Sequence, residues 1–342
     1  MSSSIKLSYI LPIYNVEKYL SDCLDSIFAQ KIPENEFEVI CVNDCSPDNS
    51  RSIILKYQEK HNNIILIEHT HNKKAGGARN TGLSVAKGKY IWFIDSDDTI
   101  ALDATSILLE KLENKKVDVL CFNYQLVYDD KVKKVSVFEK EAIYNKGYEF
   151  LLFHFSDALV YHLGYAVRCV YKRRLLLDNK IKFPEQIIFG EDTTFMAEAC
   201  MSADEVMIIS DLLYNYYQRD SSSSTKLSVS MRGEQIYESI FLAGNLVNKL
   251  KNKAQLYSQE LSNKIENGIP WFLNRLFIRL VRTSKVERNI FYKISSSNNT
   301  DIPIGDLLSY MDFKNRFIVK NPYLGGLLLN ILSFLYKLKN NK

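Results

Sequence analysis

The sequence predicts an α/β protein: a mostly parallel sheet flanked by helices, with a helical region appended at its C-terminal end. Over the first hundred residues, short apolar runs rich in β-branched residues alternate with amphipathic helical patterns. The spacing is that of strand-helix-strand units with right-handed crossovers, which build a doubly wound sheet. In the last third of the chain, apolar residues recur at helical spacing instead.

The elements follow in order. Strands are expected at 5–14, 37–42, 64–68 and 90–94, with helices at 16–28 and 50–61 and after the glycine loop 72–82. Further on, we expect a helix at 102–112, a hairpin from 117 to 137 and helical turns at 147–155. A strand at 166–171 passing into a short helix, and strands at 206–210 and 214–217, complete the body.

Composition narrows the class of protein. With 342 residues, 25% charged and 46% hydrophobic, the chain resembles an ordinary globular protein of one or two domains. The six cysteines form no Cys-x-x-Cys pair and have no histidine cluster beside them, so we expect reduced core residues. The N-terminus lacks the basic start and apolar stretch of a signal peptide.

Three predicted strands end in polar residues: Tyr14-Asn15, Asn43-Asp44 and Asp95-Ser96-Asp97. Because the carboxyl ends of parallel strands face one crevice, these side chains should converge there. The acidic run Asp95 to Asp98 would be stabilised by a divalent cation that carries a phosphorylated substrate. The alternative is a solvated turn whose aspartates cap the next helix.

A second acidic segment, Phe189-Gly190-Glu191-Asp192, precedes an apolar helical pattern. Carboxylates are favoured at a helix N-terminus, so the segment could be a plain cap.

The chain has no Gly-x-x-x-x-Gly-Lys-Ser/Thr loop, which argues against a P-loop ATPase, and Gly76-Gly77 lacks the dinucleotide-binding pattern.

Four ordered motifs resemble those of family 2 glycosyltransferases. They are residues 8–15 (Ser-Tyr-Ile-Leu-Pro-Ile-Tyr-Asn), 42–48 (Val-Asn-Asp-Cys-Ser-Pro-Asp), 78–82 (Ala-Arg-Asn-Thr-Gly) and 93–98 (Phe-Ile-Asp-Ser-Asp-Asp). The resemblance implies a GT-A fold and an inverting transfer from a nucleotide-diphosphate sugar. One departure is Cys45-Ser46-Pro47, where Gly-Ser-Thr is commoner; it should alter a turn more than the chemistry.

The same resemblance implies residue roles. Asp97 would be the direct ligand of Mn²⁺ or Mg²⁺, supported by Asp95, and Asp192 the general base. The residues implied to bind the nucleotide sugar are Pro12, Tyr14, Glu17, Asp44, Arg79, Asp95, Ser96 and Arg219.

The expected function is transfer of a hexosyl or N-acetylhexosaminyl group, with UDP-sugar as donor and a glycan as acceptor, plausibly lipid-linked, in surface polysaccharide biosynthesis. Three alternatives stay open. They are a silent nucleotide-sugar-binding protein of the same fold, a metal-dependent nucleotidyltransferase, and a hydrolase using two carboxylates. The hydrolase does not explain why acidic groups cluster at a nucleotide-type crevice.

The C-terminal third is basic. Residues 225–342 carry 18 Lys/Arg against 8 Asp/Glu, within a chain of net charge +4. We expect a catalytic domain at 1–220 and a helical region at 226–342. Its apolar stretch 324–338 is too short to span a bilayer but suits an interfacial helix. The expected location is cytoplasmic, peripheral at the inner face of the plasma membrane, and nothing in the sequence supports nucleic acid as a partner.

Overall fold

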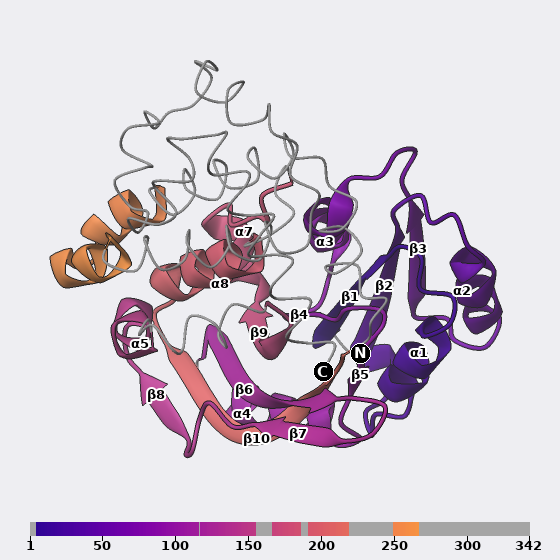
Figure 1. Cartoon of the computed structure of the whole chain (residues 1–342), viewed down its shortest axis with the longest axis horizontal. Coiled ribbons are helices and arrows are strands. Elements are labelled where there is room, and N and C mark those ends of the chain that lie inside the picture. The colour runs from indigo at the N-terminus through magenta and orange to yellow at the C-terminus, as the bar shows by residue number, and fades with distance from the viewer. Residues whose placement is uncertain (1–4, 116, 155–165, 186–190, 219–248, 267–342) are drawn as a thin grey trace, which may run out of the picture. The chain divides into compact units, whose positions relative to one another are not determined.

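A computed structural model describes residues 5–115, 117–154, 166–185, 191–218 and 249–266 (Figure 1). The chain divides into two compact units, Met1–Gln186 with Gly190–Gln218, and Ile187–Phe189 with Arg219–Lys342. Of the second unit, only residues 249–266 are described, with helical stretches at 249–255 and 259–266. The proposed interfacial helix at 324–338 lies outside the described residues.

The first unit is built on one mixed sheet, which has ten strands in the described residues, with β3-β2-β1-β4-β9-β6-β10-β5 as its main path. The strands are β1 (Leu7–Ile13), β2 (Phe37–Asn43), β3 (Ile64–Glu68), β4 (Tyr90–Phe93), β5 (Thr99–Ile100), β6 (Val119–Val127), β7 (Val132–Val135), β8 (Ala142–Tyr144), β9 (Cys169–Lys172) and β10 (Val206–Tyr217). Strands β1 to β4 pair in parallel, as does the long pair β6–β10. The predicted α/β class is confirmed, while the short strand β9 enters antiparallel between β4 and β6.

Helices flank the sheet on both faces. They are α1 (Leu20–Phe28), α2 (Ser50–Gln58), α3 (Lys74–Val85), α4 (Ala104–Asn114), α5 (Gly147–His154), α7 (Arg173–Asp178) and α8 (Glu191–Ser202), with 3₁₀ turns at Glu34–Glu36 and Ala166–Arg168. Alternate residues of β1 face opposite ways, so Tyr9 joins the apolar core that includes α1. Ile10 points to α3, where a Cβ on Gly82 would lie 2.4 Å from its Cγ2. Only glycine allows α3 to pack this closely.

Helix α1 begins later than its apolar pattern predicts. Asn15 has a left-handed backbone (φ 56°), and residues 16–19 form a turn in which the N–H groups of Tyr19 and Leu20 bond to the carbonyl of Val16. The polar segment after β1 is therefore a shaped loop rather than the first turn of a helix.

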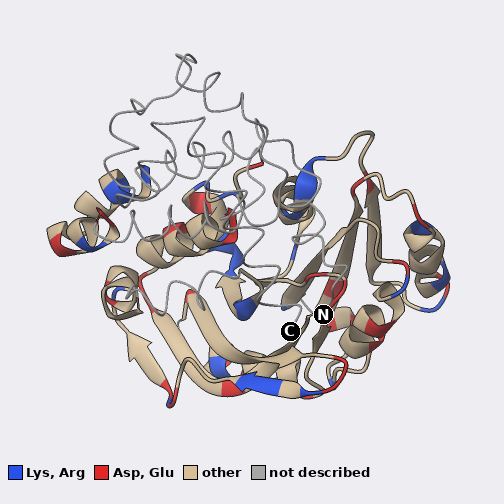
Figure 2. Cartoon of the chain, viewed as in Figure 1, with Lys and Arg blue, Asp and Glu red and all other residues tan. Residues whose placement is uncertain are grey.

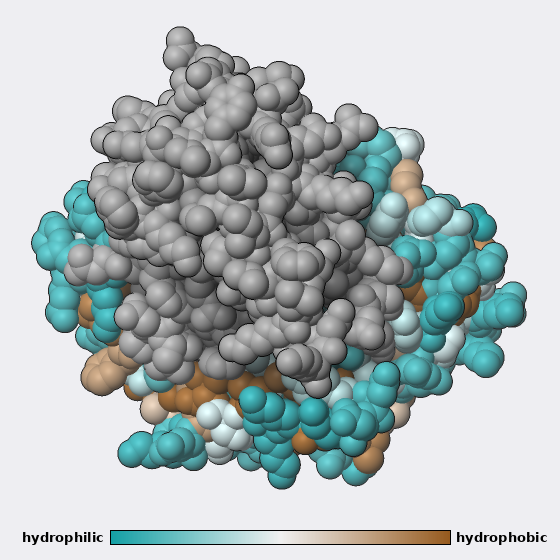
Figure 3. Space-filling view, viewed as in Figure 1, coloured by the Kyte–Doolittle hydropathy of each residue, from teal (hydrophilic) through white to brown (hydrophobic). Residues whose placement is uncertain are grey.

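Strand β10 spans what the sequence predicts as two strands, because shifts in its register with β6 between Ile208 and Tyr214 absorb the polar pair Ser210-Asp211. The predicted hairpin is present as β6–β7, and Figure 2 shows the Lys-rich β7 as a basic edge. Hydrophobic side chains gather over β6 and β10 on the visible face (Figure 3).

Two smaller findings concern the cysteines and the membrane. All six cysteines are free, but Cys45 is exposed, which corrects the expectation that all are core residues. Its backbone is left-handed (φ 57°), and this turn after β2 places it at the surface.

Within the described ranges, none of the helices combines the length and apolar character needed to cross a bilayer.

Candidate active site

The ends of β1, β2 and β4 are tied together by hydrogen bonds. Ser96 donates from its hydroxyl to the carbonyl of Pro12 at 2.7 Å, and the N–H of Asp44 donates to the carbonyl of Ile13 at 2.9 Å. The N–H of Asn15 in turn donates to Ser46 Oγ at 2.8 Å. The three polar strand ends of the sequence thus lie in one place, at the carboxyl edge of the parallel strands.

Glu17 organises the loop that follows β1. Its carboxylate accepts hydrogen bonds from the backbone and side-chain N–H groups of Asn49, at the start of α2, while its own N–H donates to Asp48 Oδ2 at 2.8 Å. The neighbouring Pro12 is half-buried, and the Tyr14 ring is 45% exposed. Glu17 therefore fixes the loop, and Tyr14 is available for stacking.

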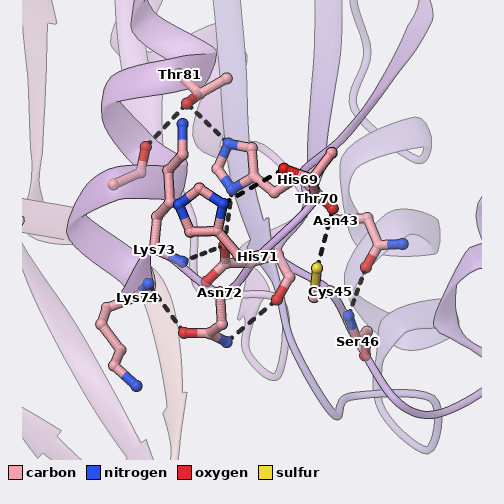
Figure 4. Close-up of polar contacts among 12 residues, drawn as sticks. Asn43, Cys45, Ser46, His69, Thr70, His71, Asn72, Lys73, Lys74 and Thr81 are labelled. Carbon is pink, nitrogen blue, oxygen red and sulfur yellow. Dashed lines mark hydrogen bonds and ion pairs between the residues drawn. The ribbon is translucent and has the colours of Figure 1, made fainter.

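Asp44 lies buried at the end of β2 within a polar cluster, and its partners His69, Asn72 and Lys73 are labelled in Figure 4. Its Oδ1 accepts the backbone N–H of Lys73 at 2.7 Å and contacts Nδ1 of His69 at 2.7 Å. Its carbonyl accepts the Asn72 side-chain amide at 3.1 Å. The cluster joins the ends of β2 and β3 to the start of α3.

Arg79 of α3 bridges two acidic segments that are far apart in the sequence. Its guanidinium donates from Nη2 to Asp95 Oδ1 at 2.6 Å and from Nη1 to Asp192 Oδ1 at 2.7 Å. The arginine side chain is 4% exposed, so its charge is held by these two carboxylates. Its Nε–H is buried and has no partner among the described residues.

The next residue, Asn80, holds the segment that leads to α8. Its amide donates to the carbonyl of Phe183 at 2.8 Å, and its carbonyl oxygen accepts the N–H of Phe183 at 2.9 Å. The Phe183 ring stacks on Phe195 of α8 at 3.8 Å between centroids, and the Arg79 guanidinium lies 5.1 Å from the ring. Residues 79 and 80 together position the start of the helix that bears Asp192.

Glu191 and Asp192 begin α8, and their different environments give the two carboxyl groups different pKa values. Burial raises the pKa of Glu191 to about 8, and the charge of Asp192 adds to this effect. Burial also raises the pKa of Asp192, but Arg79 opposes it, and the value is about 6. Of the two carboxyl groups, Asp192 therefore has the lower pKa and is the first to ionise as the pH rises.

The loop after β4 is held by β10. The hydroxyl of Tyr214 accepts the N–H of Asp95 at 3.1 Å and donates to Asp98 Oδ2 at 2.8 Å, and the N–H of Tyr217 donates to Asp98 Oδ1. Asp98 is buried, and burial raises its pKa well above the usual range. It does not cap the following helix, whose N-cap is Asp103, so the alternative of a solvated capping turn is wrong.

Replacing Tyr214 by Phe tests this arrangement. The change leaves Asp98 Oδ2 without its donor in a buried site, so we expect the free energy of unfolding to fall by about 1–3 kcal/mol. Urea denaturation followed by circular dichroism measures the loss. The control is Tyr57→Phe, which removes a hydroxyl bonded to the more exposed Asp25 and should cost less. Equal losses in the two variants would contradict the proposed importance of the Asp98 network.

The carboxylates of Asp95 and Asp97 suit a cation that binds together with a phosphorylated substrate. No group of three His, Cys, Asp or Glu side chains able to hold a metal occurs in the described residues. Asp95 shares one oxygen with Arg79, and Asp97 is half-buried beside it. Mg²⁺ is commonly held by one or two carboxylates together with substrate phosphates and water, which this pair could provide.

Sequence reasoning missed three contributors to the site: His69, Asn80 and Tyr214. Each acts through another residue, so no motif spacing marked it, although Asn80 lies within the quoted motif 78–82. Arg219, implied to bind the donor, lies outside the described residues.

Comparison with known proteins places these features in a family. Residues 8–176 match the model of glycosyl transferase family 2. The chain is 33% identical over 227 residues to a poly(ribitol-phosphate) beta-glucosyltransferase of Bacillus spizizenii, covering 66% of this chain and 34% of that protein. It is 32% identical over 234 residues to poly(ribitol-phosphate) beta-N-acetylglucosaminyltransferase TarS of Staphylococcus aureus, covering 68% and 39%. The chain thus spans little more than a third of the length of these relatives.

Solved structures agree on the fold. Residues 1–349 of S. aureus TarS in complex with UDP match with a TM-score of 0.67 at 25% identity, over 95% of this chain and 89% of that one. A mannosyltransferase of Pyrobaculum calidifontis in complex with GDP-Man and Mn²⁺ matches with a TM-score of 0.54 at 16% identity, over 100% of this chain and 89% of that one, which shows the fold alone. The expected GT-A architecture is confirmed.

Proposed function

This chain belongs to glycosyl transferase family 2, and from that premise we propose that it transfers a sugar from a nucleotide-diphosphate donor to a glycan acceptor with inversion at the anomeric carbon. The observation that carries the proposal is the Arg79 bridge. It brings the end of β4, where the donor's diphosphate is expected, together with the Asp192 carboxylate at the start of α8.

Asp192 acts as the general base. An ionised carboxylate takes the proton of the acceptor hydroxyl as that oxygen attacks the anomeric carbon from the face opposite the leaving group. Its pKa of about 6 keeps it ionised near neutral pH while leaving it more basic than an ordinary aspartate. A single displacement of this kind needs no covalent sugar–enzyme intermediate.

The leaving group is a nucleoside diphosphate. Asp97, with Asp95 beside it, is the residue that would hold Mn²⁺ or Mg²⁺, which when bound supplies positive charge to the departing diphosphate. Asp44, Ser96, Pro12 and Tyr14 surround the place where the nucleoside is expected, at the ends of β1 and β2.

The substrates are inferred from relatives. The TarS structure with UDP supports a UDP-sugar as donor. The two poly(ribitol-phosphate) transferases named above support a cell-surface polymer as acceptor. The basic C-terminal third suits an anionic acceptor or membrane surface, and we place the protein at the cytoplasmic face of the plasma membrane, where a lipid-linked glycan would be extended.

A donor panel tests the proposal. The purified chain is incubated with UDP-glucose, UDP-N-acetylglucosamine, GDP-mannose or CDP-activated sugar, with Mn²⁺, and with poly(ribitol-phosphate) or another surface glycan as acceptor. We expect UDP release that depends on the acceptor and stops with EDTA. Release of pyrophosphate would favour a nucleotidyltransferase, and binding of donor without turnover on any acceptor would favour a silent binding protein.

A further inference from the structure

We propose that His69 is a positioning residue that fixes the Asp44 carboxylate for recognition of the donor's nucleoside, an inference that rests on the function proposed above. His69 follows β3, is 5% exposed, and has no role in the chemistry described so far. Together with Asn72, its side chain links the end of β2 to helix α3.

Both ring nitrogens of His69 are engaged (Figure 4). Nδ1 lies 2.7 Å from Asp44 Oδ1, and Nε2 lies 2.9 Å from the hydroxyl of Thr81 on α3. Since a carboxylate can only accept, Nδ1 carries a proton and donates to Asp44. The Thr81 hydroxyl, which also lies 3.1 Å from the carbonyl oxygen of Gly77, bonds to Nε2. The backbone N–H of His69 also bonds to the carbonyl of Asn43 at 2.9 Å, which fixes the ring against the end of β2.

The two donors to the Asp44 side chain converge on the same oxygen. Oδ1 receives His69 Nδ1 and the backbone N–H of Lys73, whereas Oδ2 meets no donor among the described residues. The Asp44 side chain is 3% exposed, but Oδ2 is not completely buried, so it can accept a hydrogen bond from a bound ligand. An N–H of a base or a hydroxyl of a ribose is the kind of group that would satisfy Oδ2.

Holding Oδ1 from two sides fixes the plane of the carboxylate and therefore the direction in which Oδ2 accepts. Without His69, only the Lys73 N–H would hold Oδ1, and the carboxylate could rotate. Binding would then require the carboxylate to be ordered again, which weakens affinity for the nucleoside without touching the reacting atoms. A histidine that merely filled space between β2 and α3 would have no such specific effect.

The test compares three substitutions of His69 in the full chain. The amide nitrogen of Asn can take the place of Nδ1, whereas that of Gln reaches toward Nε2, and Ala replaces neither. UDP affinity is measured by titration calorimetry, and kcat at saturating UDP-sugar is measured alongside. We expect His69→Ala and His69→Gln to weaken UDP binding about tenfold or more. His69→Asn should stay within a few-fold of wild type, with kcat little changed in all three variants.

The matched control is His61→Ala, which removes a histidine paired at 2.8 Å with Glu34, just before the start of β2 and not at the end that bears Asp44, and should leave UDP affinity unchanged. His69→Ala binding as tightly as wild type, or His69→Asn binding as weakly as His69→Gln, would overturn the inference alone. The Asn and Gln variants keep the comparison decisive even where Ala fails to fold. Wild-type protein that binds none of UDP, GDP and CDP would instead overturn the proposed function, and the inference with it.

Discussion

Replacing Asp192 by Asn is expected to lower kcat about 10²–10⁴-fold while leaving the KM for the UDP-sugar close to wild type. Asn keeps the shape of the side chain and can still accept a hydrogen bond from Arg79, but it cannot take a proton from the acceptor. The donor's nucleoside is expected at the ends of β1 and β2, so its binding should be spared. Initial rates over a range of donor and acceptor concentrations separate the two effects.

The neighbouring acid offers the matched control. Because burial keeps Glu191 protonated near pH 7, Glu191→Gln replaces a neutral group with a neutral one of the same size. It should retain most of the activity that Asp192→Asn loses. If Glu191→Gln were as inactive as Asp192→Asn, the general base would be Glu191, or both carboxyl groups would act together.

Replacing Arg79 by Met is expected to move the pH dependence of transfer toward higher pH. The base must be ionised, so the rate of the wild-type enzyme should rise with pH through about 6, the pKa of Asp192. Arg79 lowers that pKa, and Asp95 raises it. Removing the guanidinium leaves the two carboxylates without their shared cation, so Asp192 stays protonated to a higher pH and kcat at pH 7 falls.

The measurement is kcat at saturating donor from pH 5 to 9, together with thermal unfolding, because breaking a buried ion pair can cost about 3–5 kcal/mol. Arg51→Met, which removes a more exposed arginine paired with Glu68, is the control and should leave the profile in place. A folded Arg79 variant whose rate still rises through pH 6 would contradict the assignment of Asp192 as the titrating base.

Much of the fold follows from local patterns in the sequence. The strands β1 to β4 and the helices between them are predicted because each is a short apolar run or an amphipathic stripe closed by turn residues. The meeting of the strand ends at Asp44 and Asp95 follows from parallel topology alone. The roles of Asp97 and Asp192 come instead from family resemblance and remain predictions.

What sequence reasoning could not provide depends on tertiary contacts. Strand β9 is a short run whose antiparallel insertion between β4 and β6 no periodicity encodes. The two-residue strand β5 forms only because Asn215 and Tyr214 lie beside it. Likewise, the motif that contains Arg79 predicts a contact with the nucleotide. Its ion pair with Asp192, 113 residues away, depends on the fold and could not be predicted from the motif.

One consequence concerns the continuous stretch from α8 to the end of β10. It begins at Glu191, next to the proposed base Asp192, and ends at Tyr217, whose N–H bonds to Asp98 in the loop after β4. A single piece of chain therefore connects the proposed base to the loop after β4, with only residues 203–205 between helix and strand. Lengthening that connection is expected to change the separation between Asp192 and the loop after β4. Insertions in the β6–β7 turn are expected to leave that separation unchanged.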